Sequence, residues 1–369
     1  MVRNTNPNEK PYDKLNKTLD FWHPEDIGNT KKGEPILNDK QVDQFINDGF
    51  VVLKNLWPQE LIEKAKVEAM DIVKPSDISN PRAFNKAIDF PFPEFRENKI
   101  KSLNYMSIHP RVLSICSQLL SCDIMDLRLS QSHIIGKLGK VFNRPGHKTH
   151  GQLMGDQDIH VDYGNNTLVV PPKVNGPEAV AILCYYSDVE ECGGATHFAK
   201  ALPGELTTST IFNPPNFVFD LDNEVTNGDD NSDEDDVYKP RSKENINRLL
   251  NEEKPVYYSP GTCIVYRMDS WHRGTPVLLN KFRHTHHHVI RKKHSIHHQW
   301  QSFAPKMALM PRRFLETLSV EQRTAITFPE PGHSYWTPET LHAVGKRYPN
   351  MDMTPYYYER GGNNIKSKI

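Results

Sequence analysis

The spacing of apolar residues divides the chain into a helical first third and a β-rich middle. Between residues 38 and 125, apolar positions recur every three or four residues, which is the period of amphipathic helices. Asn38 and Gln41 have the spacing of a capping box before the first helix, and Pro110 stands where a helix commonly begins. The apolar run at residues 50–53 predicts a short buried strand between two of these helices.

From residue 126 onward the period of the pattern falls to two. Residues 127–135 alternate between apolar and polar side chains and predict a strand. Further strands are predicted at 158–163, 167–170, 179–187, 256–259, 262–268 and 282–290. One short helix at 244–252 is expected among them, so the pattern favours an antiparallel barrel or jelly roll over alternating strands and helices.

The end of the chain turns helical again. Ser319 with Gln322 is a second capping-box pattern, and Thr337 precedes a proline that suits the first position of a helix. The predicted fold class is therefore mainly β with helices, α+β, with helical additions at both ends. We expect a loose arm at 1–37, one domain at 38–300 with a helical entry at 38–125, a jelly-roll core at 126–300 and an acidic insertion at 220–238, and a helical extension at 301–369 packed on the same domain.

Composition narrows the classes of function. The formal net charge of -1 gives no global field for a nucleic acid or an anionic membrane. The five cysteines form no close pair, which is typical of reduced thiols inside a cell. No secretory signal and no apolar run of about 20 residues is visible, so a cytoplasmic location is expected. Ser367-Lys368-Ile369 is similar to a peroxisomal address with its last residue changed, although a chance polar tail is simpler.

The candidate chemistry starts from His160 and Asp162 on the predicted strand at 158–163. Side chains two apart on a strand point to the same face. One imidazole and one carboxylate aimed at one point are two-thirds of a facial triad, which binds Fe(II) and leaves positions open for substrate and oxygen. His272, just beyond a later strand, is the leading candidate for the third ligand, and Arg283 follows eleven residues on. A buried arginine beside an iron site suits a bidentate grip on a carboxylate.

In this order and spacing, the four residues resemble the phytanoyl-CoA dioxygenase family of Fe(II)/2-oxoglutarate-dependent oxygenases. Residues 39–53 resemble the family's N-terminal helix and strand. Residues 191–198 resemble its glycine-rich turn, with the departure that Ala195 and Thr196 replace bulkier residues and His197 comes early. The resemblance covers roughly residues 38–300.

The resemblance implies a double-stranded β-helix with iron at one mouth. His160, Asp162 and His272 would bind Fe(II), and 2-oxoglutarate would chelate the metal beside O2. Arg283 would pair with the distal carboxylate of 2-oxoglutarate, and Thr275 could donate a hydroxyl to the same group. The implied reaction is hydroxylation of a small molecule, with decarboxylation of 2-oxoglutarate to succinate and CO2. Asp162 favours hydroxylation, because halogenating relatives carry a small residue at that position.

Other polar residues allow two interpretations each. Gln131, on a strand expected beside the metal, is either a cosubstrate contact or a satisfied polar core residue. In the tract 284–288, His287 shares a strand face with Arg283, and the other histidines face outside against a helix or solvent, so a second metal site is disfavoured. The basic loop 137–150 either contacts an anionic substrate or is a solvated face.

Two alternative functions remain open. A nucleic-acid demethylase shares the triad, but the near-neutral charge disfavours it. A metal-binding jelly-roll protein without oxygenase activity, such as an isomerase or a ligand-binding relative, is disfavoured by Arg283, because a buried guanidinium without a carboxylate is costly. We therefore expect a small-molecule substrate, with neither nucleic acid nor membrane as a partner.

Overall fold

The structure, a computed structural model, describes residues 20–27, 35–92, 102–147, 150–162, 177–202, 243–295 and 312–357. The acidic insertion at 220–238, the expected strand at 167–170 and the tail at 367–369 lie outside the described residues. The described residues include no helix that is both long and apolar enough to cross a membrane.

Two β-sheets form the centre of the molecule. The large sheet has the strand order β1 (Glu25–Asp26), β2 (Phe50–Lys54), β8 (Cys263–Arg267), β5 (Ala179–Tyr185), β10 (Phe282–Lys292), β4 (Leu127–Leu138) and β3 (Asn85–Asp89). The small sheet has the order β7 (Lys254–Pro255), β6 (Thr196–Ala199) and β9 (Trp271–Gly274). Neighbouring strands are antiparallel except β1 and β2. The predicted α+β class with a jelly-roll core is confirmed.

The two sheets face each other across a shared apolar interior. Phe50 of β2 and Phe198 of β6 approach to 4.5 Å between ring centroids, and Tyr266 of β8 lies 5.1 Å from the ring of His272 of β9. Because side chains alternate along a strand, one set of positions on β10 points into this interior and the other points to the opposite face of the large sheet. The interior is where the predicted site residues converge.

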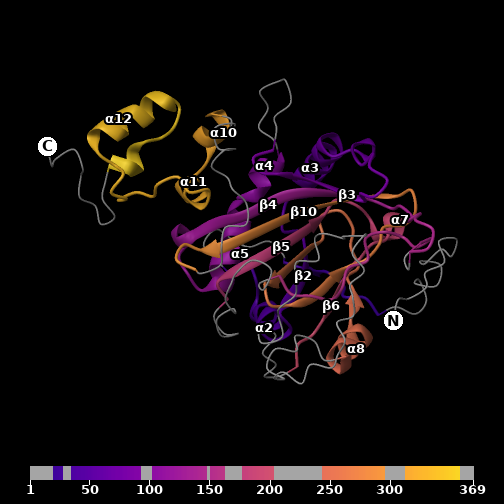
Figure 1. The fold of residues 1–369 in the computed structure, drawn as a ribbon. Helices are drawn as coiled ribbons and strands as arrows, with labels where there is room; N and C mark the ends of the chain where they lie inside the picture. Colours follow the sequence, from indigo (N-terminus) through magenta and orange to yellow (C-terminus); the bar gives the residue numbers. More distant parts are fainter. Residues whose placement is uncertain are drawn as a thin grey trace, which may run out of the picture.

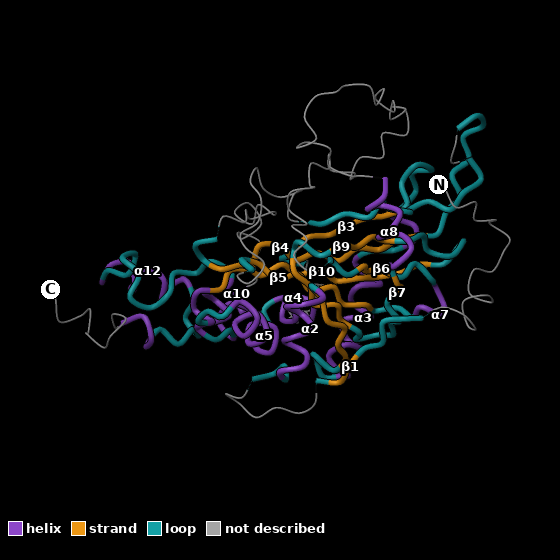
Figure 2. Tube along the Cα trace, turned by 90° about the horizontal axis from the view of Figure 1, so that it is seen from below, coloured by secondary structure: helices purple, strands orange, loops and turns teal. Residues whose placement is uncertain are grey.

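Helices cover the outer face of the large sheet. They are α2 (Asp39–Asp48), α3 (Gln59–Ile72), α4 (Ser102–Ser107) and α5 (Pro110–Leu120), and they lie together on one side of the strands (Figures 1 and 2). The capping box predicted at Asn38 and Gln41 is present, and Pro110 is the first residue of α5 as predicted. Gly49 ends α2 with a φ of 86°, a left-handed conformation that favours glycine.

The C-terminal helices stand at one end of the large sheet (Figure 1). They are α10 (Arg312–Thr317), α11 (Val320–Ala325) and α12 (Pro338–Arg347), and both predicted caps, at Ser319 and Thr337, are present. The half-buried carboxylate of Glu330 bridges Arg128 of β4, at 2.8 Å, and Lys293 just after β10. The described residues also include the helices α7 (Val189–Cys192) and α8 (Lys243–Glu252) and the short turns η1 (Pro75–Asp77), η2 (Ile124–Asp126) and η4 (Thr354–Tyr357).

Two strand predictions are wrong in part. The stretch 158–162 is not a regular strand, since His160 makes only an isolated bridge with His272. The amide of Gly274 donates to the side-chain oxygen of Gln157 at 2.9 Å. In a regular antiparallel sheet this amide would donate to a backbone carbonyl of the neighbouring strand instead. Of the strand expected at 256–259, only Val256 pairs, in an isolated bridge to Trp22.

Gly139, just after β4, lets the turn before β10 approach the backbone closely. The amide of Gly139 donates to the carbonyl of Lys281 at 2.9 Å, and a Cβ added at Gly139 would lie 1.8 Å from the carbonyl oxygen of Leu278. Any larger residue must therefore push the turn before β10 away from the end of β4.

We expect Gly139→Ala to destabilise the fold by about 2 kcal/mol or more through this backbone clash. The matched control is Gly345→Ala in α12, where the added methyl meets only Met353 at 4.0 Å and helix propensity should add up to about 1 kcal/mol of stability. Chemical denaturation of both variants measures the difference, and equal stability of the two would contradict this packing.

Candidate metal centre

The structure brings together the three predicted ligands from two segments far apart in the sequence. Oδ1 of Asp162 lies 3.7 Å from Nε2 of His160 and 3.6 Å from Nε2 of His272. The three atoms all lie within 4.8 Å of one another, and this is the one group of its kind found among the described residues. Two nitrogens and one oxygen thus converge on a single point at the inner edge of β9.

Backbone carbonyls fix the orientation of both imidazoles. Nδ1 of His160 lies 2.8 Å from the carbonyl of Asp158, and Nδ1 of His272 lies 2.9 Å from the carbonyl of Ser270. A carbonyl oxygen can only accept, so each Nδ1 carries the proton and each Nε2 presents its lone pair. This is the tautomer that metal-binding histidines need, and the hydrogen bond on the far nitrogen orients the ring.

Tyr266 holds the other oxygen of Asp162. Its phenol donates to Oδ2 at 2.9 Å, while Oδ1 is the oxygen that lies near both imidazoles. Burial and the Asp162 carboxylate raise the pKa of Tyr266 well above its usual value, so the phenol stays protonated and remains a donor. With Oδ2 held in this way, Oδ1 alone is turned toward the imidazoles.

Arg273 fastens the loop that carries two of the three groups. Its Nε and Nη2 donate to both oxygens of Glu253, each at 2.7 Å, and its Nη1 donates to Asp156. Arg273 follows His272 on β9, while Asp156 stands four residues before His160. The buried guanidinium therefore ties the loop to the strand.

Arg283 lies inside the barrel without a counter-charge. It is 3% exposed, and its Nε and Nη1 have no hydrogen-bond partner within the part of the chain that the structure describes. Its guanidinium carbon lies 5.7 Å from the ring centroid of Tyr185. The glycine turn passes close by, since a Cβ at Gly194 would come within 3.2 Å of Nη1. The arginine is thus buried and faces the interior, and its role toward an anion stays a prediction.

His272 and Arg283 come from different sheets. β9 belongs to the small sheet and β10 to the large one, so the chain passes from one sheet to the other between the two residues. The two residues therefore face the interior from opposite walls.

Lys137, which the sequence predicts in the basic loop 137–150, is a second buried cation of the interior. It lies on β4 directly opposite Arg283 of β10 and is 8% exposed. Burial, and then repulsion by Arg283, lower the pKa of Lys137 to about 7. Strand alternation carried on from Gln131 would have placed it on the inner face, but the nearby glycines suggested a loop.

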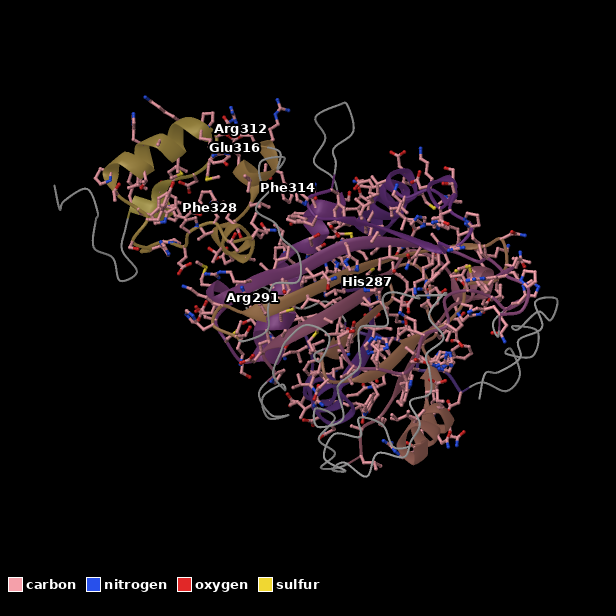
Figure 3. The ribbon with its side chains drawn as sticks, in the orientation of Figure 1. His287, Arg291, Arg312, Phe314, Glu316 and Phe328 are labelled. Carbon is pink, nitrogen blue, oxygen red and sulfur yellow. The ribbon has the colours of Figure 1, made fainter. Side chains whose placement is uncertain are left out.

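Gln131 faces the interior at the other end of the same strands. Its Nε2 lies 2.9 Å from Nδ1 of His133, whose ring stacks obliquely on His287 at 4.8 Å. Burial lowers the pKa of His133 to about 4 and that of His287 well below its usual value, so both imidazoles are neutral near pH 7. These side chains form a neutral polar wall, and Figure 3 shows His287 near the middle of β10.

The remaining predicted residues have structural partners. Thr275 donates its hydroxyl to the carbonyl of Ala195 at 2.7 Å, so in this arrangement it has no proton to offer a cosubstrate carboxylate. His284, His286 and His288 point to the opposite face of β10 and are buried. Of the two surroundings expected for them, a helix or solvent, burial excludes solvent. His286, for example, bonds to Ser132 at 3.0 Å and to Tyr186 at 2.9 Å. They do not converge on a second metal site among the described residues.

Comparisons with known proteins find similarity in structure alone. No protein-family model matches the chain, and no curated protein matches it. Among solved structures, it is similar to the non-heme alpha ketoglutarate dependent epimerase SnoN from nogalamycin biosynthesis, with a TM-score of 0.43 and 14% identity over 69% of this chain and 82% of that one. It is also similar to the alpha ketoglutarate dependent carbocyclase SnoK, with a TM-score of 0.44 and 14% identity over 74% and 92%. EctD from S. alaskensis, crystallised with bound Fe, has a TM-score of 0.45 and 13% identity over 72% and 80%. The membership of the phytanoyl-CoA dioxygenase family inferred from the motifs stays a prediction.

We expect Tyr266→Phe to weaken divalent-metal binding about 10- to 100-fold, because Asp162 loses the donor that orients its carboxylate. Titration of the apoprotein with Fe(II) under anaerobic conditions measures this. The control is Tyr257→Phe, which removes a surface phenol bonded to Glu190 at 2.9 Å. Equal metal affinity in the two variants would show that Tyr266 does not position the carboxylate.

Proposed function

We propose that this protein is an Fe(II)- and 2-oxoglutarate-dependent dioxygenase that hydroxylates a small molecule. The observation that carries the proposal is the combination of two oriented imidazoles and one carboxylate with a buried arginine facing the same interior. The three ligands alone would make only a metal site, and the arginine alone only an anion site. Together they supply a metal site and a carboxylate site within one barrel.

The donor set fits ferrous iron. Two neutral imidazoles and one carboxylate would leave the bound ion with a net charge of about +1 and three positions for other ligands. When bound, Fe(II) with 2-oxoglutarate would supply oxidative decarboxylation to succinate and CO2, coupled to the use of O2. Nε2 of His160, Oδ1 of Asp162 and Nε2 of His272 would hold the metal.

The protein's own groups would bind the cosubstrate and keep water out. A buried guanidinium without an anion is costly, and a carboxylate that pairs with it in two hydrogen bonds relieves that cost. Arg283 would therefore hold the distal carboxylate of 2-oxoglutarate. The rings of Phe198 and Tyr266 pack against that of His272 and would limit access of bulk water to a metal held there.

Two other assignments are part of the proposal. Gln131, on the inner face of β4, would contact the cosubstrate or the substrate through its amide. The substrate would be a small molecule, because a formal net charge of only -1 gives the chain no global field for a nucleic acid. The alternative, a metal-binding jelly-roll protein without oxygenase activity, differs in one observable: it would form no succinate from 2-oxoglutarate.

We expect Asp162→Ala and His272→Ala each to abolish formation of succinate from 2-oxoglutarate and to lower the bound iron to below about one tenth of the protein. The loss follows because two remaining ligands hold a ferrous ion weakly. His294→Ala, which removes an exposed histidine, is the control and should retain both properties. Full iron content and turnover in either ligand variant would refute the assigned roles.

We expect Arg283→Ala to raise the Kd of 2-oxoglutarate about 10- to 100-fold while leaving iron content unchanged, because the ion pair with the distal carboxylate is lost. Binding is measured anaerobically on iron-loaded protein. Arg347→Ala, which removes an exposed arginine from the end of α12, controls for the change in net charge. Unchanged affinity in Arg283→Ala would place the cosubstrate elsewhere.

A further inference from the structure

Lys137 and Arg283 form a pair of buried cations side by side. They are direct partners in the antiparallel register of β4 and β10, so their side chains point to the same face with Cβ atoms about 5 Å apart. Both are less than 10% exposed. Two like charges at this separation in a buried site repel each other, so the pair is favourable only with an anion between them.

No acidic side chain of the described residues meets this pair. On β10, Arg283 and His287 lie toward Lys137, and neither carries a negative charge: Arg283 is a cation and His287 is neutral. On β3, the residue opposite Lys137 is the uncharged Asn85, and Asp89 stands opposite His133 instead. From β9, the backbone of Gly274 lies close to Nζ of Lys137, since a Cβ there would be 3.3 Å away.

Lys137 also makes no hydrogen bond among the residues that the structure describes. Its ammonium lies over the ring of Phe84, at 5.7 Å from Nζ to the centroid. Lys140, three residues further along the chain, behaves differently, because its ammonium donates to the carbonyls of Ile78 and Asn80. Lys137 therefore lacks hydrogen bonds because its side chain points into the interior.

We propose, resting on the function proposed above, that Lys137 and Arg283 bind the same distal carboxylate of 2-oxoglutarate, and that Lys137 takes up a proton from solvent as this carboxylate binds. Arg283 is the permanent half of the site, because a guanidinium keeps its charge in proteins. Lys137 is the half whose charge depends on the ligand. The carboxylate supplies the negative charge that favours the ammonium form.

The direction of the pH dependence follows from linkage. In the ligand-free protein the pKa of Lys137 is lowered to about 7 by burial and by Arg283, and the bound carboxylate raises it. Below pH 7 the lysine is already charged, so affinity is constant. Above pH 7 a proton must be taken up, so the Kd rises up to about tenfold per pH unit until the pKa of the complex is reached. His133 and His287 stay neutral over this range and do not contribute.

The test is calorimetric titration of 2-oxoglutarate into iron-loaded protein without oxygen, between pH 6 and pH 9, in two buffers of different ionisation enthalpy. We expect uptake of about half a proton at pH 7 and close to one proton at pH 8. Lys137→Arg should bind with no proton uptake and a flat pH profile. Lys137→Gln should bind more weakly, again with a flat profile. The control is Lys86→Gln, a cation on β3 that lies 3.4 Å from Asp77, which should keep the wild-type profile.

A second ligand tests whether Lys137 binds the distal carboxylate of 2-oxoglutarate. 2-Oxobutanoate has the chelating keto acid but no distal carboxylate, so it should bind without proton uptake in the wild-type protein. Proton uptake with 2-oxobutanoate, or uptake that persists in Lys137→Arg, would overturn the inference while leaving the proposed function standing. If iron-loaded wild-type protein does not bind 2-oxoglutarate at any pH, the proposed function fails and the inference falls with it.

Discussion

A reciprocal pair of backbone hydrogen bonds organises the candidate site. The amide of His160 donates to the carbonyl of His272, and the amide of His272 donates back, each at 2.9 Å. This single bridge sets an irregular loop against the last strand of the small sheet and places both imidazoles beside one carboxylate. Arg273 fastens the loop from behind, and Tyr266 holds the carboxylate from the large sheet. Since these supports come from both sheets, the site depends on the closure of the whole barrel.

The barrel interior separates two kinds of environment. Toward β6 and β8 it is aromatic and apolar, and toward β4 and β10 it carries neutral imidazoles and two cations. Three other buried arginines are each matched by an acid, Arg128 by Glu330, Arg267 by Asp269 and Arg273 by Glu253. Arg323 lies over the ring of Tyr356 instead and has no ion pair within the described part of the chain. Arg283 and Lys137 are matched by no acid among the described residues. Two buried cations side by side without an acid, in the interior that also holds the three metal-type donors, support the proposal of an anionic ligand between them.

Local patterns predicted local structure well. The capping boxes at Asn38 and Ser319 are present, and the helix predicted after Thr337 begins at Pro338. Alternation located β4, β5 and β10 within a few residues. Residue types and spacing singled out the three candidate ligands that the structure brings together. What the sequence could not supply was register between distant strands. Nothing in it says that Lys137 stands opposite Arg283, that Tyr266 reaches Asp162, or that a side-chain amide at Gln157 interrupts the strand before His160.

The most direct test of the metal centre is a crystal structure of the iron-loaded protein grown without oxygen, with anomalous data collected on both sides of the iron absorption edge. The account predicts one iron peak bounded by Nε2 of His160, Oδ1 of Asp162 and Nε2 of His272. An iron peak elsewhere in fully loaded protein, or one at this place that lacks any of the three as a ligand, would contradict it.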